Sequence, residues 1–349
     1  MRLRDWLLGL IGRAPKREGG QLTAVRGRHS HVIILDGTMS SLDDGHETNA
    51  GLLYKLLSEQ GPRLGLTVYY EAGIQWRDWS RTWDVIAGRG INRQIQRAYG
   101  VLASRYRPGD LIFLVGFSRG AYAVRSLAGV IDRIGLLRAE DATERNIREV
   151  YRHYQASPDS EAAAVFAARH CHETVEIEAV ALWDTVKALG LRVPLLWRFL
   201  PEKHAFHNHA LGPAIRHGFH ALALEERRMA YAPVMWVCNP DWPGQMEQVW
   251  FRGTHGDVGG QLGGFLEARP LANIPLVWII SRLEMCGLEL PDGWRSRYEQ
   301  DAGAPSIGAW RGWSKLFLWR RRRVVGRDPS ERLHEAVQQA PEIGLVLAD

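Results

Sequence analysis

The amino-acid sequence of 349 residues predicts an α/β fold with a mostly parallel central sheet, helices on both faces and cap-like insertions. Short apolar runs of strand character alternate with stretches in which apolar residues recur at helical spacing. One apolar run ends in Gly116-Phe117-Ser118-Arg119-Gly120, which leads straight into an apolar helical stretch. The apolar fraction of 46% is ordinary for a globular protein and leaves ample material for a core.

Strands are expected where apolar residues run almost without interruption and turn residues follow. Strands of a parallel sheet are covered on both faces, so their sequences are continuously apolar rather than alternating. One such run leads into Gly37-Thr38, and another ends at Asp184. The expected strands are residues 31–36, 66–70, 111–115, 175–183, 234–238 and 248–251.

Helices are expected between these runs, where apolar residues return every three or four positions. Ile91, Ile95, Tyr99 and Leu102, for example, fall on one face of a helix. The expected helices are residues 49–57, 91–106, 121–131, 142–156, 160–170, 220–229 and 271–285.

Several segments depart from this alternation. Residues 1–28 are expected to form a basic amphipathic segment and a linker, ahead of a single domain over residues 29–349. The amphipathic part predicts an interfacial membrane helix, a helix docked on the protein's own surface or a frayed tail. Residues 73–90 carry three tryptophans between charges and are expected to form a loop or lid. Residues 187–214 are expected to form a cap-like excursion.

Charge and cysteine content argue against several classes of protein. The net charge of +5 is spread along the chain and no nucleic-acid-binding module is recognisable, so no nucleic-acid partner is expected. Cys171, Cys238 and Cys286 form no metal motif and are expected to be buried free thiols in a reducing compartment. We expect no metal and no other cofactor.

The apolar segments of the sequence bear on the location of the protein in the cell. No apolar run approaches the roughly 20 residues that span a bilayer, and no signal-peptide cleavage site follows the short apolar stretch near the N-terminus. We therefore expect a cytoplasmic protein, with membrane association or export without a signal peptide as alternatives.

The pentapeptide around Ser118 has the composition of a nucleophile elbow. A strand that turns sharply into a helix strains its turning residue and crowds the positions two before and two after it. Gly116 and Gly120 relieve that crowding because they carry no side chain. The Ser118 hydroxyl would then stand clear of the backbone at a helix N-terminus, where anions are stabilised. The alternative is a tight turn whose serine only caps the helix.

Two later residues can complete a catalytic serine site. A serine hydroxyl becomes a nucleophile when a base takes its proton and a carboxylate orients that base. In α/β-hydrolases these groups follow in the order Ser, Asp or Glu, His, on loops after strands. Asp184 directly follows the expected strand at residues 175–183. His255 lies in a glycine-rich loop after the expected strand at residues 248–251. The alternatives are an N-cap role for Asp184 and an ordinary loop position for His255.

Asp257 is the rival acid, two residues after His255. It can pair with that histidine, hold the glycine loop through main-chain N–H groups, or bind a metal. We favour the structural role.

Two main-chain N–H groups are needed to stabilise an oxyanion. Arg119, directly after the nucleophile, is expected to supply one, and Gly37 or Thr38 the other. Asp36 is a possible supporting residue, or a carboxylate that only ties down its loop. The Arg119 side chain points to the same region, where it can hold a phosphate or acidic substrate or form a structural ion pair.

Several short motifs in a fixed order resemble the α/β-hydrolase domain of the type VI secretion phospholipase effectors. The resemblance is strongest over residues 30–290. The motifs are Leu35-Asp36-Gly37-Thr38, Thr48-Asn49, Gly109-Asp110, Gly116 to Tyr122, Trp183-Asp184-Thr185-Val186, His220 to Arg228 and Trp250 to Gly260.

The resemblance implies a serine esterase of phospholipase type, with Ser118 as nucleophile, Asp184 as acid and His255 as base. The expected substrate is a lipid or a small ester, with peripheral contact to a membrane as an open alternative. Two alternatives are a soluble esterase or thioesterase for a small substrate and a non-catalytic interaction protein. The latter would use the four arginines at 320–323 and the N-terminal segment for docking.

Overall fold

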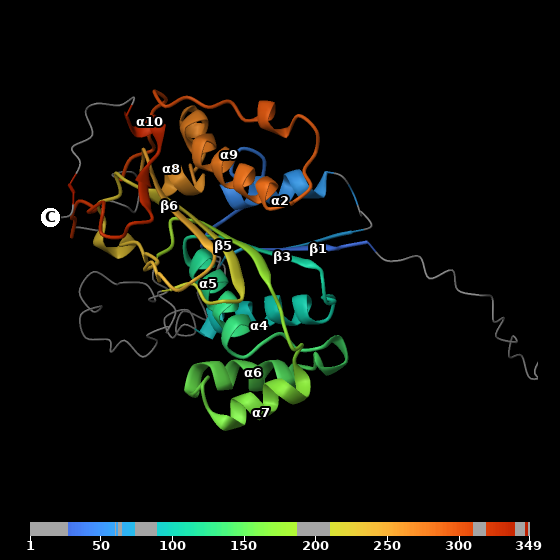
Figure 1. Ribbon diagram of the computed structural model, residues 1–349. Helices are drawn as coiled ribbons and strands as arrows, with labels where there is room; N and C mark the ends of the chain where they lie inside the picture. Colours follow the sequence, from blue (N-terminus) through green and yellow to red (C-terminus); the bar gives the residue numbers. More distant parts are fainter. Residues whose placement is uncertain are drawn as a thin grey trace, which may run out of the picture.

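A seven-stranded sheet, parallel at every strand pairing, forms the centre of the computed structural model (Figure 1). The strand order is β2-β1-β3-β4-β5-β6-β7. The structure describes residues 27–59, 61, 65–73, 89–186, 210–309, 319–338 and 346–347. The strands are β1 (Ser30–Leu35), β2 (Leu66–Glu71), β3 (Leu111–Phe117), β4 (Ile177–Trp183), β5 (Ile215–Ala223), β6 (Gln245–Phe251) and β7 (Glu331–Leu333).

The order of the strands creates a switch point between β1 and β3. From β1 the chain moves outward to β2, then returns to add β3 on the opposite side of β1. In open parallel sheets, the crevice for ligands lies at the carboxyl ends of the strands where the order reverses. Leu35 of β1 pairs with Gly116 of β3, so Asp36 and Ser118 both lie at this edge of the sheet.

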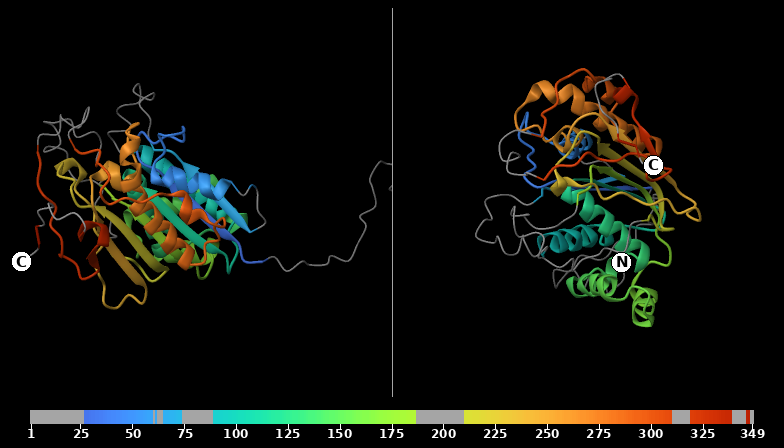
Figure 2. Two further views of the ribbon diagram at one scale, coloured as in Figure 1. Left: turned by 90° about the horizontal axis from the view of Figure 1, so that it is seen from above. Right: turned by 90° about the vertical axis from the view of Figure 1, so that its left-hand side faces the viewer.

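Helices cover the sheet on both faces, as Figures 1 and 2 show. One face carries α4 (Arg89–Ala103) and α5 (Arg119–Arg133), and α6 (Glu144–Ala156) packs against these two helices on the side away from the sheet, with α7 (Glu161–His170) beside α6. The other face carries α2 (Asn49–Ser58), α8 (His255–Gly259) and α9 (Arg269–Met285). The remaining helices are α10 (Glu335–Gln338) and the 3₁₀ turns Ala139–Asp141, Met229–Tyr231, Leu266–Ala268 and Trp294–Arg297.

The sheet separates two hydrophobic cores. Every residue of β3 and β4 is buried, because these central strands have neighbours on both sides and helices on both faces. Side chains that alternate along β1 divide between the cores, Ile33 facing α4 and α5 and Ile34 facing α2 and α9. The predicted α/β class with its parallel, doubly covered sheet is therefore confirmed.

Two predicted elements are wrong. Residues 220–229 are rich in helix-forming Ala, Leu and Glu, but His220 to Ala223 belong to β5. Their main chain pairs with β4 on one side and β6 on the other, and that tertiary pairing outweighs local propensity.

Residues 234–238 are not a strand. Both edges of β6 are already occupied, by β5 and β7, so this apolar run has no strand edge to join. Instead the side-chain amide of Gln248 satisfies its main chain: Trp236 N–H donates to Gln248 Oε1 (2.9 Å), and Gln248 Nε2 donates to Trp236 O (3.0 Å). Strand β7 was missed because three residues with two charged side chains show no apolar period.

The prediction of three buried thiols is wrong for Cys238, which is exposed, while Cys171 is buried and Cys286 is partly buried. Among the described helices, none is long and apolar enough to cross a membrane. Three predictions fall mainly outside the described residues: the amphipathic segment at 1–28, the lid at 73–90 and the cap-like excursion at 187–214.

Gly120→Ala tests how closely β1 and α5 approach one another. A Cβ at Gly120 would collide with the main-chain oxygens of Leu35 and Asp36, which cannot move aside as a side chain can. We expect a loss of about 3 kcal/mol or more in the free energy of unfolding, measured by urea titration. Gly100→Ala is the matched control, since that helical Cβ meets only the end of the Ile147 side chain. Equal stability of the two variants would contradict the close approach.

Candidate active site

Ser118 occupies the sharp turn between β3 and α5. Its backbone has φ 57° and ψ −120°, a region that residues with a side chain rarely adopt. The turn is possible because a Cβ at Gly116 would lie 2.7 Å from the backbone of Ala121, and one at Gly120 would collide with β1. The serine side chain makes no helix-capping hydrogen bond, so the structure gives no support to the capping alternative.

A continuous hydrogen-bonded chain joins Ser118, His255 and Asp184. His255 Nε2 lies 2.9 Å from Ser118 Oγ, and His255 Nδ1 lies 2.6 Å from Asp184 Oδ2. All three residues are buried. The imidazole is held between two aromatic rings, stacked on Phe117 and tilted against Tyr231, each with its ring centroid 4.8 Å away.

The position of His255 depends on helix α2. His255 begins the short helix α8, and the Asn49 side-chain amide donates to Val258 O in that helix (2.9 Å) and to Ala272 O in α9 (3.0 Å). Asn49 therefore ties α2 to the two helices that follow β6. The histidine thus lies in a helix rather than in the predicted open loop.

Asp184 follows β4 with a positive φ of 36°, and its carboxylate is fully buried. Oδ1 accepts a hydrogen bond from the N–H of Ala223 (3.0 Å). Arg323 contacts both carboxylate oxygens, Nη1 at 2.5 Å from Oδ1 and Nη2 at 2.9 Å from Oδ2. Burial alone would raise the pKa of Asp184, but Arg323 and His255 outweigh it and hold that pKa well below its usual value.

Arg323 was not among the site residues predicted from the sequence. It is the last of four consecutive arginines, which were assigned as a group to a docking surface. Arg321 and Arg322 are exposed, whereas Arg323 is buried. No sequence pattern separates it from its neighbours, because only the folded chain places it beside Asp184.

Asp257 holds the loop after β6 rather than the imidazole. Its Oδ2 accepts from Thr254 N (2.7 Å), Thr254 Oγ1 (2.8 Å) and Ser306 Oγ (2.6 Å), and its Oδ1 accepts from Ile307 N (2.8 Å). These four bonds cap α8 and fasten it to residues 306–307. The geometry supports the structural role that we favoured.

The residues expected to form the oxyanion hole lie beside Ser118. A Cβ at Gly37 would lie 3.2 Å from Ser118 Cβ, so the loop after β1 contacts the nucleophile. The Gly37 N–H donates to Asp36 Oδ1 (2.6 Å). The Gly37 N–H is therefore already engaged, which leaves the Thr38 N–H as the candidate donor from this loop. Arg119 starts α5, where main-chain N–H groups have no acceptor within the helix.

Asp36 anchors that loop. Its carboxyl accepts hydrogen bonds from Thr48 Oγ1 (2.6 Å), Tyr70 OH (2.7 Å) and Gly37 N. Burial raises the pKa of Asp36 to about 6, although these hydrogen bonds lower it in part. Asp36 makes no described contact with the imidazole or with Ser118 Oγ, so its effect on the site passes through the loop.

A buried ion pair supports the main chain of His255. Arg228 Nη2 lies 2.6 Å from Glu226 Oε2, which also accepts from the N–H of His255 (3.3 Å).

His220 supports the end of β4 beside Asp184. Its Nε2 accepts from the N–H of Thr185 (3.1 Å), and burial lowers the pKa of His220 to about 3. His220 is therefore neutral at physiological pH and holds the strand end through a hydrogen bond.

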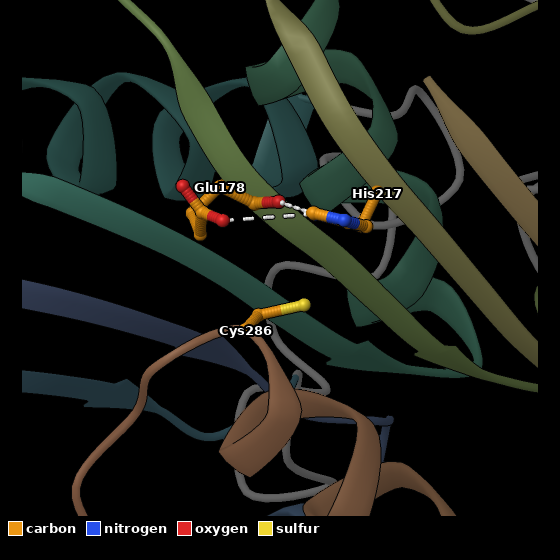
Figure 3. A group of neighbouring side chains, drawn as sticks. All are labelled: Glu178, His217 and Cys286. Atoms are coloured by element: carbon orange, nitrogen blue, oxygen red, sulfur yellow. Dashed lines mark hydrogen bonds and ion pairs between the residues drawn. The ribbon is translucent and has the colours of Figure 1, made fainter.

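One group elsewhere has the residue types of a metal site. Glu178, His217 and Cys286 lie near the opposite ends of β4 and β5 from Asp184 (Figure 3). His217 Nδ1 lies 2.9 Å from the main-chain oxygen of Glu178, and burial raises the pKa of the Cys286 thiol to about 12. The Nδ1 contact to Glu178 O joins β5 to β4, and we assign this group no catalytic role.

Comparison with known proteins relates the chain to one family. The family described as T6SS, phospholipase effector Tle1-like, catalytic domain matches residues 29–282. An uncharacterized protein of Saccharomyces cerevisiae is 25% identical over 233 residues, covering 60% of this chain and 33% of that protein.

Two solved structures are also similar. One is an uncharacterized protein from Pseudomonas aeruginosa, with 16% identity and a TM-score of 0.39, covering 80% of this chain and 52% of that one. The other is the Tle1 effector bound to the VgrG spike of the type 6 secretion system, with 16% identity and a TM-score of 0.29, covering 67% and 51%. The chain thus spans a third of the yeast relative and about half of each solved structure.

Asp36→Asn tests the buried carboxyl at the switch point. With a pKa of about 6 against an ordinary 3.8, the folded state binds this proton more tightly than the unfolded state. The resulting stability is present below about pH 4 and is lost as pH rises through 6, by about 3 kcal/mol at most. We expect urea unfolding of Asp36→Asn to depend less on pH between 4 and 7. The exposed Asp43→Asn serves as control, and an Asp36→Asn profile parallel to wild type would contradict the assignment.

Proposed function

The chain belongs to the Tle1-like family of type VI secretion phospholipase effector catalytic domains, and on that premise we propose that it is a serine hydrolase of lipid esters. Ser118 is the nucleophile, His255 the general base and Asp184 the acid that orients the base. The single observation that carries the proposal is the unbroken hydrogen-bonded chain from Ser118 Oγ through the imidazole to Asp184.

The geometry supports a two-step acyl transfer. His255 Nε2 takes the proton of Ser118 Oγ as that oxygen attacks the ester carbonyl, and the imidazolium then gives the proton to the departing alcohol. Water, activated by the same imidazole, releases the acid from the acyl-enzyme. Because its pKa is held low, the Asp184 carboxylate stays ionised and stabilises the imidazolium in both steps.

The negative oxygen of each tetrahedral intermediate would be held by main-chain N–H groups of Arg119 and Thr38. The first begins α5, so the positive end of the helix dipole adds to it. The second comes from the loop that Asp36 anchors beside Ser118. Donors fixed in this way need no reorganisation when charge develops on the substrate.

The Arg119 side chain favours a substrate with a phosphate group. Burial lowers the pKa of its guanidinium, and among the described residues no carboxylate pairs with it. Tyr231, whose ring packs against His255, lies close to this guanidinium. A partly buried cation beside the nucleophile, with no acidic partner among the described residues, suits an anionic headgroup, so we infer a glycerophospholipid substrate.

Ser118→Ala is expected to abolish hydrolysis, because no other group in the site can form the acyl-enzyme. Release of fatty acid from phospholipid vesicles should fall by about 10⁴-fold or more, and labelling by a fluorophosphonate probe should disappear. Ser126→Ala is the matched control on the same helix, where the hydroxyl only donates to Tyr122 O. Equal fatty-acid release by wild type and Ser118→Ala would refute the proposal.

Arg119→Leu tests the class of substrate. It keeps the main-chain N–H but removes the cation, so kcat/KM should fall about 10- to 100-fold for phospholipid and little for a neutral short-chain ester. Arg119→Lys should retain part of the phospholipid activity. If both substrates suffer equally, Arg119 serves the turn rather than a headgroup, and a small-substrate esterase becomes the better assignment.

A further inference from the structure

We propose that Arg323 is a positioning residue of the catalytic apparatus, which holds the Asp184 carboxylate in the orientation that binds His255 Nδ1. The inference rests on the proposed serine hydrolase function and deepens it. The proposed catalytic apparatus then comprises four residues, which are Ser118, His255, Asp184 and Arg323.

Every described hydrogen bond of the Arg323 guanidinium is directed into the site. Nη1 donates to Asp184 Oδ1 (2.5 Å) and to Ala223 O (2.7 Å), and Nη2 donates to Asp184 Oδ2 (2.9 Å) and to Tyr231 O (2.6 Å). The planar fork matches the carboxylate at both oxygens, which a lysine ammonium cannot do. The side chain is only 5% exposed, and that of Asp184 is 0% exposed.

The bonds of Arg323 reach two groups that border the imidazole. Asp184 Oδ2 accepts from His255 Nδ1 and from Arg323 together. The Tyr231 ring lies 4.8 Å from the imidazole, and its main-chain oxygen is bound by the same guanidinium. Loss of Arg323 would therefore free both the carboxylate that orients His255 and the ring that packs against it.

Arg323 reaches this position from a segment that lies outside the family match. Residues 319–325, here called the C-terminal strap, run along the chain that follows β5. Trp319 O accepts from Met229 N (3.0 Å), and Arg321 N donates to Arg227 O (2.7 Å). The strap then continues toward β7 at the edge of the sheet, drawn in red in Figure 1. The matched region alone thus lacks one of the groups that contact Asp184, the Arg323 guanidinium.

The charge of Arg323 also affects the imidazole. The Asp184 carboxylate makes the electrostatic potential at the imidazole negative, and a negative potential favours the protonated form of a neighbouring group. Arg323 offsets part of that negative field. The other titratable groups around Asp184 are the neutral His220 and Arg228, with Glu226 behind Arg228. Because Arg228 is paired with Glu226, Arg323 is the cation that balances Asp184.

The test compares two substitutions of Arg323 with a control on the same strap. Arg323→Met removes the charge, Arg323→Lys keeps the charge but loses the fork, and Arg321→Met removes an exposed charge that does not contact Asp184. Three quantities are measured against pH: kcat/KM on a short acyl ester, the rate of fluorophosphonate labelling, and the NMR titration of the His255 imidazole. Thermal unfolding is recorded for each variant.

We expect kcat/KM of Arg323→Met to fall about 100-fold, with its acidic limb and the imidazole titration moved about one unit to higher pH. Arg323→Lys should lose activity but keep the acidic limb near that of wild type, and Arg321→Met should match wild type throughout. A merely structural residue would lower stability and activity without moving either titration.

An Arg323→Met protein with unchanged kcat/KM and an unchanged imidazole titration would overturn the inference. If Arg323→Met does not fold, Arg323→Lys decides: wild-type kcat/KM would overturn the inference, and reduced kcat/KM with an unmoved acidic limb would support it. Failure of the proposed function is distinguishable, because wild type would then neither hydrolyse esters nor react with the fluorophosphonate. The imidazole titration would still report the effect of Arg323.

Discussion

The buried carboxylate of Asp184 is the interaction around which the site is organised. A negative charge at this depth is unfavourable unless cations and hydrogen-bond donors surround it, and Asp184 draws them from three parts of the chain. His255 comes from α8, Arg323 from the C-terminal strap, and the N–H of Ala223 from the end of β5. The charge that would orient the base thus also holds together segments distant in sequence, which couples stability of this region to the geometry of the site.

Strained backbone conformations also constrain the site, in addition to the buried charge of Asp184. Ser118 and Asp184 both have positive φ, and both directly follow a strand at the carboxyl edge of the sheet. Such conformations are unfavourable on their own and persist only where the surroundings determine them. Two glycines let α5 approach β1 and β3 closely enough to hold the turn at Ser118, and β5 fixes Asp184 through main-chain bonds. Rigid strands therefore place the reacting groups, while the loop anchored by Asp36 contributes N–H donors.

Much of the fold and the resemblance to the family could be predicted because both depend on local sequence patterns. Continuously apolar runs marked most strands, and the family match over residues 29–282 confirms the resemblance carried by the ordered motifs. The failures occurred where tertiary pairing decided. Residues 220–223 joined a strand because β4 and β6 flank them, and residues 234–238 found no strand edge to join. Likewise, Cys238 is exposed at the end of an apolar run in which Val234 and Trp236 are buried.

By itself the sequence predicted the parallel sheet and the sharp turn at Ser118, and it marked Asp184 and His255 as candidate partners of that serine. These follow from local spacing, because glycine, apolar runs and strand-end residues have meaning within a few positions of the chain. Only the tertiary structure decided that His255 and Asp184 lie within hydrogen-bonding distance of each other and of Ser118, and that Asp257 caps a helix. The tertiary structure also decided that Arg323, and none of the three arginines before it, is buried beside Asp184. The physical reason is that a buried charge is defined by what surrounds it in space, and its partners here lie up to 139 residues away along the chain.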